Sequence, residues 1–150
     1  MTTRSFTTKR NSIAKSIAEL LKQIDGTGSY NTNLYENVHP KLLFWDEISE
    51  YPAVHLTPGE ELREYQGGGY KDRYLYVTVR CYVQDDDAAE VLEGLLEDIE
   101  TVIEENGRLA YQDSLGTTNF THDIRIERIN TDEGALNPIG VGEILLQVHY

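Results

Sequence analysis

The chain has 150 residues, of which 39% are hydrophobic and 26% charged, a composition typical of one folded domain rather than a disordered chain. Its single cysteine, Cys81, excludes an internal disulfide and a zinc site built from several cysteines. No apolar run approaches the roughly 18 residues of a transmembrane helix, and residues 1–12 lack the apolar centre of a signal peptide. We therefore expect no membrane span, and folding in the cytoplasm.

The formal net charge of −13 is unevenly distributed. Residues 1–22 carry five Lys or Arg side chains against one acid, Glu19, so the rest of the chain carries −17. An acidic body argues against nucleic-acid binding through the main surface, because phosphate binding needs clustered cations. It permits self-association of a basic segment with a neighbour's acidic surface, although the acidity could equally serve solubility alone.

The first predicted element is an amphipathic helix over residues 8–24. Thr7 or Thr8 is a suitable N-cap, and Asp25-Gly26 is a typical stop. One face of this helix is apolar: Ile13, Ile17, Leu20, Leu21 and Ile24. A polar loop over residues 26–37 follows, long enough to be mobile or ordered by a partner.

Residues 51–57 read as a strand that Pro58-Gly59 ends. Residues 60–71 are charged and contain Gly67, Gly68 and Gly69, which predicts a flexible hairpin connection. The clearest strand covers residues 74–83, with five alternating positions facing a core: Leu75, Val77, Val79, Cys81 and Val83. Its other face carries Tyr74, Tyr76, Thr78, Arg80 and Tyr82, a set suited to being covered by a partner.

Residues 85–107 form a predicted helix with ten acidic residues and no Lys or Arg. Its apolar side comprises Ala88, Val91, Leu92, Leu95, Leu96, Ile99, Val102 and Ile103. The opposite side is a stripe of one charge sign, formed by Glu90, Glu93, Glu97, Glu100 and Glu104. Like charges four residues apart cost a few tenths of a kcal/mol each, so this stripe is an unusual surface for a helix.

Two strands, over residues 122–130 and 143–150, complete the chain. The order α-β-β-α-β-β predicts an α+β fold: a mostly antiparallel sheet with two helices packed on one face. We expect a single domain over residues 1–150, with a basic N-terminal segment (about 1–8) and a flexible hairpin loop (about 59–73).

The sequence contains no catalytic pattern. His39, His55, His122 and His149 are dispersed and show no metal-ligand spacing. The run 85–87 has the wrong spacing for a calcium loop and fits a helix start better. The glycine triplet lacks the Lys-Ser/Thr of a phosphate loop, and Cys81 fits a core position. We therefore predict no catalytic residue, cofactor or metal.

Several segments together resemble one protein family. They are Phe44-Trp45-Asp46-Glu47-Ile48, Tyr51-Pro52-Ala53-Val54, the strand 74–83, the acidic helix with Leu95-Leu96-Glu97-Asp98-Ile99-Glu100, Thr131-Asp132-Glu133-Gly134, Pro138, Gly140-Val141-Gly142-Glu143-Ile144 and Val148-His149-Tyr150. In order and spacing, over residues 10–150, this pattern resembles the tail-terminator proteins of long-tailed bacteriophages.

The resemblance implies an α+β subunit of a homohexameric ring at the head-proximal end of the tail tube. Such a ring ends tube polymerisation, joins the head connector or neck protein, and lets DNA pass through its lumen without specific binding. It would be part of the virion, assembled in the host cytoplasm. Another neck or head-completion protein, and an acidic inhibitor or immunity-type protein, remain the alternatives; an enzyme is a third.

On this interpretation two sets of residues become candidate sites. The stripe Glu90, Glu93, Glu97, Glu100 and Glu104 could line the lumen and repel DNA, or could face outward. The hairpin loop could contact the tube protein or the next subunit through Arg63, Gly67, Gly68, Gly69, Lys71 and Arg73. The basic N-terminal segment could also clamp a neighbour or be a frayed end.

Overall fold

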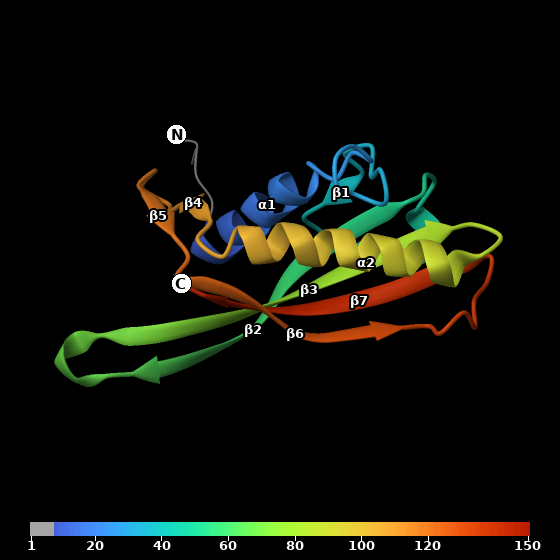
Figure 1. The fold of residues 1–150 in the computed structure, drawn as a ribbon. Coiled ribbons are helices and arrows are strands. Elements are labelled where there is room, and N and C mark those ends of the chain that lie inside the picture. Colours follow the sequence, from blue (N-terminus) through green and yellow to red (C-terminus); the bar gives the residue numbers. More distant parts are fainter. Residues whose placement is uncertain (1–7) are drawn as a thin grey trace.

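The computed structural model describes residues 8–150 and has two layers (Figure 1). One layer is a five-stranded sheet in the order β1-β2-β3-β7-β6, and the other comprises α1 and α2, which pack on the same face of that sheet. The expected α+β class, with a mostly antiparallel sheet and two helices on one face, is confirmed. Residues 1–7, which hold most of the basic N-terminal segment, lie outside the described part.

Helix α1 covers Lys9–Leu21 and begins at Thr8, whose side chain accepts a hydrogen bond from the Asn11 amide at 3.4 Å. Its inward residues, among them Ile13 and Ile17, are fully buried. The helix ends three residues before the expected Ile24. Residues 22–24 donate instead to carbonyls three positions back, which tightens the last turn into a 3₁₀-like geometry and still buries Ile24.

The sheet is built mainly from four long strands, β2 (Ala53–Tyr65), β3 (Lys71–Gln84), β6 (Asp123–Thr131) and β7 (Ile139–His149), paired antiparallel. The inward positions of β3 from Leu75 to Cys81 are fully buried, as the alternation predicted. A two-residue strand, β1 (Val38–His39), pairs parallel to β2 and makes the sheet mixed.

Helix α2 covers Ala88–Glu105 and crosses β3, β7 and β6. The Asp87 side chain accepts from the Glu90 amide, so the acids at the start of the helix act as a cap. Close packing under the helix depends on Gly140 of β7. A Cβ at that position would lie 2.9 Å from Val83 and 3.1 Å from the Ala88 carbonyl, so a larger residue would push α2 off the sheet.

Two expectations about strands were wrong, and one short pair was missed. Pro58-Gly59 does not end β2, because a bulge between Pro58 and Glu61 absorbs the irregularity and the strand continues to Tyr65. Strand β7 begins at Ile139, four residues earlier than expected. The short pair β4 (Ala110–Gln112) and β5 (Thr118–Phe120), beside α1, was not predicted, because strands of three residues show too little alternation.

The extension of β2 and β3 produces the most distinctive part of the outline. The last pair between β3 and β7 is Tyr74 with His149, so the two strands continue beyond the sheet as a two-stranded ribbon (Figure 1). We call residues 62–71 the arm. All of them are exposed, and the turn at Gly67–Gly69 includes Gly68 and Gly69 at φ +78° and +83°. The flexibility expected of this hairpin stays a prediction.

Candidate assembly interface

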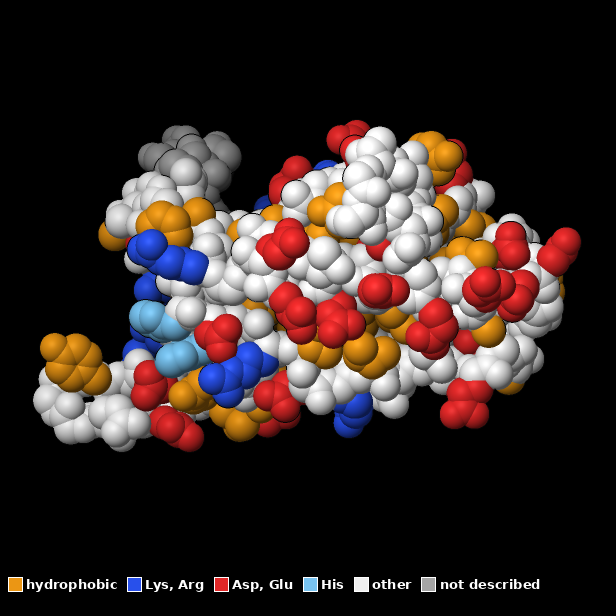
Figure 2. Space-filling view, viewed as in Figure 1, with side chains coloured by type: hydrophobic (Ala, Val, Ile, Leu, Met, Phe, Trp, Pro, Cys, Tyr) orange, Lys and Arg blue, Asp and Glu red, His pale blue; other side chains and the backbone are white. Residues whose placement is uncertain are grey.

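The acidic stripe lies where the helical pattern placed it. All five glutamates are exposed, and Figure 2 shows carboxylates spread along the face that carries α2, while Lys and Arg gather toward the base of the arm. No ion pair to a described residue neutralises any of the five: Glu90, Glu93, Glu97, Glu100 and Glu104. The stripe is therefore a surface of unbalanced negative charge.

One acid of the same helix, Asp98, points the other way. It is 1% exposed, and its two carboxylate oxygens accept from the backbone and side chains of Asn31 and Thr32 at 2.6–3.0 Å. These bonds fasten the polar loop 26–37 onto α2. This role of Asp98 was not predicted, although the signal is present in the sequence: Asp98 falls three residues after Leu95 and four before Val102, on the apolar side.

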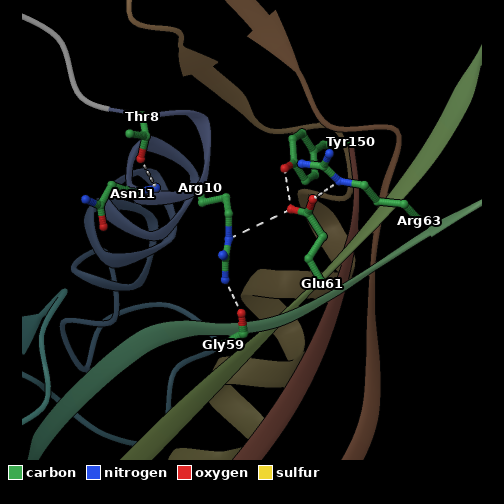
Figure 3. A network of polar contacts seen from close by, with 7 residues as sticks. All are labelled: Thr8, Arg10, Asn11, Gly59, Glu61, Arg63 and Tyr150. Atoms are coloured by element: carbon green, nitrogen blue, oxygen red, sulfur yellow. Dashed lines mark hydrogen bonds and ion pairs between the residues drawn. The ribbon is translucent and has the colours of Figure 1, made fainter.

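The base of the arm is held by a junction around Glu61 (Figure 3). Glu61 accepts hydrogen bonds from the Tyr150 hydroxyl and from Arg63 Nε, and its carboxylate lies 3.8 Å from Arg10 Nε of α1. Arg10 also donates to the Gly59 carbonyl. The junction thus joins the first helix, the start of the arm and the last residue of the chain.

The pKa of Glu61 reflects this environment. Burial raises the pKa of the carboxyl, but the hydrogen bonds from Tyr150 and Arg63 and the nearby cationic charges outweigh burial, so the pKa lies below its ordinary value. For the Tyr150 hydroxyl, burial and the neighbouring carboxylate both raise the pKa. The carboxylate is therefore charged, and the phenol neutral, at physiological pH.

The arm cations proposed from the sequence differ in availability. Arg63 is bound at 2.5 Å to Glu61, and the Arg73 guanidinium lies 5.3 Å from the centre of the Tyr150 ring, so both help to build the junction. Lys71 is exposed and forms no ion pair within residues 8–150. Arg63 and Arg73 pair across the base of the arm, whereas Lys71 pairs with Tyr65 next to the turn that holds the glycine triplet.

The arm also carries apolar surface that was not predicted from the sequence. Leu62, Tyr65 and Tyr70 are 48%, 73% and 75% exposed. A charged neighbour beside each residue, such as Glu64 before Tyr65 and Lys71 after Tyr70, obscured this signal in the sequence. Three large hydrophobic side chains in ten residues, on a ribbon that no other described element covers, are typical of a contact surface.

No helix or strand of residues 8–150 forms a second layer on the sheet face away from the helices, and this face is lined by cross-strand pairs. Arg80 binds Glu143 at 3.0 Å, and Gln147 donates to the Tyr76 hydroxyl at 3.0 Å. His55 is fully buried beneath this face and stacks on Tyr82, with no hydrogen-bond partner for either ring nitrogen in the described chain. Burial, together with the charge of Arg80, lowers the pKa of His55 to about 4.

Neither a metal centre nor a membrane span emerges from the described residues. No three His, Cys, Asp or Glu side chains in residues 8–150 are grouped so that they could hold a metal ion. The helices of this part of the chain are also too short or too polar to cross a bilayer. The surfaces that remain as candidate sites are the acidic stripe, the arm and the open sheet face.

A comparison with known families decides what kind of protein presents these surfaces. A family model described as Bacteriophage Tail Tube Terminator Protein matches residues 7–150. The chain belongs to this family. It is also 36% identical, over 149 residues, to the tail tube terminator protein p142 of Escherichia phage T5, with 94% of this chain and 92% of that protein covered. As a member of this family, the chain is a structural protein of a phage tail.

A solved structure has the same fold. A chain in the virion of a native gene transfer agent particle superposes with a TM-score of 0.57, covering 92% of this chain and 93% of that one, at 6% identity. At such low identity the likeness concerns the fold alone. The family resemblance expected from the order and spacing of motifs is confirmed by the family match and by the relative in phage T5.

Proposed function

We propose that this chain forms a homohexameric ring on the head-proximal end of the tail tube, where it ends polymerisation of the tube protein. The free face of the ring would join the head connector. The observation that carries the proposal is the 36% identity to a tail tube terminator along nearly the whole length of both proteins. The role requires binding rather than turnover, so we assign no catalytic step and no cofactor.

The acidic stripe is suited to line the lumen of such a ring. Genomic DNA must pass through without being held, and each Lys or Arg contact to a phosphate would add affinity by counterion release. From Glu90 to Glu104 the helix rises by roughly 21 Å, so one stripe per subunit would repel DNA along a tunnel of that length. The surplus negative charge on α2 then serves as a non-binding surface.

Charge reversal at the two ends of the stripe tests the lumen assignment. Rings carrying Glu90→Lys and Glu104→Lys should assemble normally but hold DNA, and particles built with them should eject DNA poorly. A matched control reverses two exposed acids away from α2, Glu36 and Glu50, and should leave ejection unchanged. Normal ejection by the stripe variant, with rings intact, would show that the stripe does not line the lumen.

The arm is the candidate contact with the tube or with the next subunit. Its support is the exposure of Leu62, Tyr65 and Tyr70 on a ribbon outside the sheet. Deleting residues 66–69 should shorten the arm without touching the junction at Glu61, and should weaken ring formation or tube docking. Unchanged assembly and tail length after this deletion would remove the arm from the interface.

The oligomeric state tests the proposal as a whole. Light scattering on the purified protein, at two protein and two salt concentrations, should give a species of six times 17.1 kDa. A persistent monomer that also fails to associate with tube ends would contradict the ring. Such a monomer would instead suit an acidic inhibitor acting in a heterocomplex.

A further inference from the structure

A shallow hollow lies between α2 and the edge strand β6. It has a volume of about 360 Å³ and is lined by Glu93, Gly94, Leu96, Glu97, Glu100 and Ile129. Its floor is apolar and its rim is acidic. This composition favours an occupant that carries an aromatic or aliphatic side chain beside a cation.

The hollow exists because the core is left open at this edge. Ile129 pairs in the ladder with Ile144, which is fully buried, so both side chains point to the helix side of the sheet. Ile129 nevertheless remains 41% exposed, because β6 is the last strand of the sheet and no described residue covers its outer side. Ile129 is therefore an apolar side chain on the core side of the sheet that the described part of a single chain leaves partly exposed.

The arm carries the matching chemistry on one of its two faces. Arg63 lies on the same side as the Glu61 carboxylate, toward α1, as Figure 3 shows. Tyr65, two residues further along β2, shares that side by strand alternation, whereas Leu62 and Glu64 lie on the other. Arg63 uses its Nε on Glu61, which leaves its terminal nitrogens able to donate to a second carboxylate.

We propose that the arm of one subunit docks into this hollow on the next copy of the chain. Tyr65 covers Ile129 and Leu96, and Arg63 meets the carboxylates of Glu97 and Glu100. Arm and hollow are different surfaces of one chain, so the contact is heterologous and repeats from copy to copy until a ring closes. The arm then covers the middle of the stripe, Glu93, Glu97 and Glu100, so the lumen role proposed above falls to Glu90 and Glu104, which lie at the ends of α2 and stay outside the contact.

This inference rests on the proposed ring and names the contact that closes it. It also explains why an unsupported ribbon is kept long. A two-stranded hairpin alone is marginally stable in water. The neighbour's helix and edge strand would supply the packing surface that this hairpin lacks. The basic junction and the acidic helix would then attract each other during assembly.

Disulfide trapping in assembled tails tests the docking directly. Cysteine is introduced at one of the positions 62, 63, 64 or 65, each combined with Ile129→Cys, and tails built with each variant are oxidised. Native Cys81 does not interfere, because it is buried and burial raises its thiol pKa to about 12. Ile129→Cys alone is the control for adventitious coupling.

The expected result alternates along the strand. Positions 63 and 65 should give a ladder of covalent multimers on a denaturing gel without reductant, and positions 62 and 64 should give none. No ladder at 63 and 65, or equal ladders at all four positions, in tails that contain the chain would overturn the docking while leaving the ring intact. Absence of the chain from tails would instead contradict the proposed function itself.

A charge exchange provides a second measurement that does not depend on cysteine chemistry. Arg63→Glu should raise the protein concentration needed for half-assembly about tenfold, and adding Glu97→Arg and Glu100→Arg in the same chain should restore it. The control is Arg125→Glu, which breaks a surface pair with Asp123 away from the hollow and should not weaken assembly. Failure of the combined variant to recover, with the control normal, would contradict the assigned pairing.

Discussion

The body and the arm of this molecule share the same two strands but are held by different forces. In the body, the inner parts of β2 and β3 lie between other strands and under two helices, with fully buried positions such as Val54 and Val79. In the arm, the same strands pair only with each other, and every residue from 62 to 71 is exposed. The body is therefore stable by its own burial, whereas the arm has little burial of its own and would gain most from the proposed contact with the next subunit.

The two regions should differ most in how far truncation of a large side chain lowers the free energy of unfolding. Leu95→Ala, at a fully buried position of α2, should lower the free energy of unfolding by about 3 kcal/mol, because a cavity remains in the core. Tyr65→Ala in the arm should change it by less than about 0.5 kcal/mol. Urea unfolding of both variants measures this, and similar midpoints for the two would contradict the separation.

Acid should weaken the body through His55. Its pKa is about 4 in the folded chain against an ordinary 6.5, so the unfolded chain binds this proton first as pH falls. Stability from this group is therefore complete above pH 6.5 and declines toward pH 4, by up to about 3 kcal/mol. In urea titrations His55→Leu should flatten this decline, whereas His122→Gln, at an exposed position, should not.

The buried carboxylate of α2 provides a smaller effect. Asp98→Asn replaces an acceptor oxygen with an NH₂ group facing donors from Asn31 and Thr32, and should cost about 2 kcal/mol. The adjacent exposed change Glu97→Gln removes the same charge and should cost nothing. Hydrogen exchange at the Thr32 amide should increase only in the first variant, and equal effects would show that the charge, not the buried bonds, matters.

The junction between body and arm should respond more weakly and locally. Tyr150→Phe removes one hydrogen bond to Glu61 and should lower the free energy of unfolding by about 1 kcal/mol. Because this hydrogen bond lowers the pKa of Glu61 while burial raises it, the pKa of Glu61 should rise in the variant. The stabilisation from Glu61 is present above its ordinary pKa and lost as pH falls through the lowered one. NMR titration of the carboxyl in both proteins measures the shift, with Tyr35→Phe, at an exposed ring, as control.

The smallest effect concerns the stripe. Glu100→Gln relieves repulsion from Glu97 and Glu104 and should stabilise the chain by a few tenths of a kcal/mol in dilute buffer. The gain should shrink as salt screens the charges. Thermal melts at low and high ionic strength measure this, and a loss of stability in this variant would show that Glu100 has a favourable partner in the free subunit.

The same comparison explains what could be predicted from the sequence. The elements of the body could be predicted because burial imposes a periodic pattern of apolar residues on the sequence. Strand β3 alternates along its length, and α2 repeats apolar residues at helical spacing. The arm was predicted as a flexible loop over residues 59–73 instead of paired strands, because Pro58-Gly59 signals a break, and only the three-dimensional bulge shows that the strand continues past it.

The candidate sites were predictable to different degrees. The five glutamates of the stripe could be placed on the exposed side of α2, because helical geometry fixes their direction. The junction at Glu61 could not be predicted, since it joins Arg10, Glu61 and Tyr150 from three distant parts of the chain. The hollow beside Ile129 likewise depends on which strand ends the sheet, and this is a property of the topology.

Tail length tests the central claim most directly. Electron microscopy of tails from phage that lack this chain, compared with phage supplied with it, measures whether the chain ends the growth of the tube. The account predicts a single tail length when the chain is present, and tubes of uncontrolled, mostly greater length when it is absent. Tubes of the same defined length in both samples would contradict a terminator role.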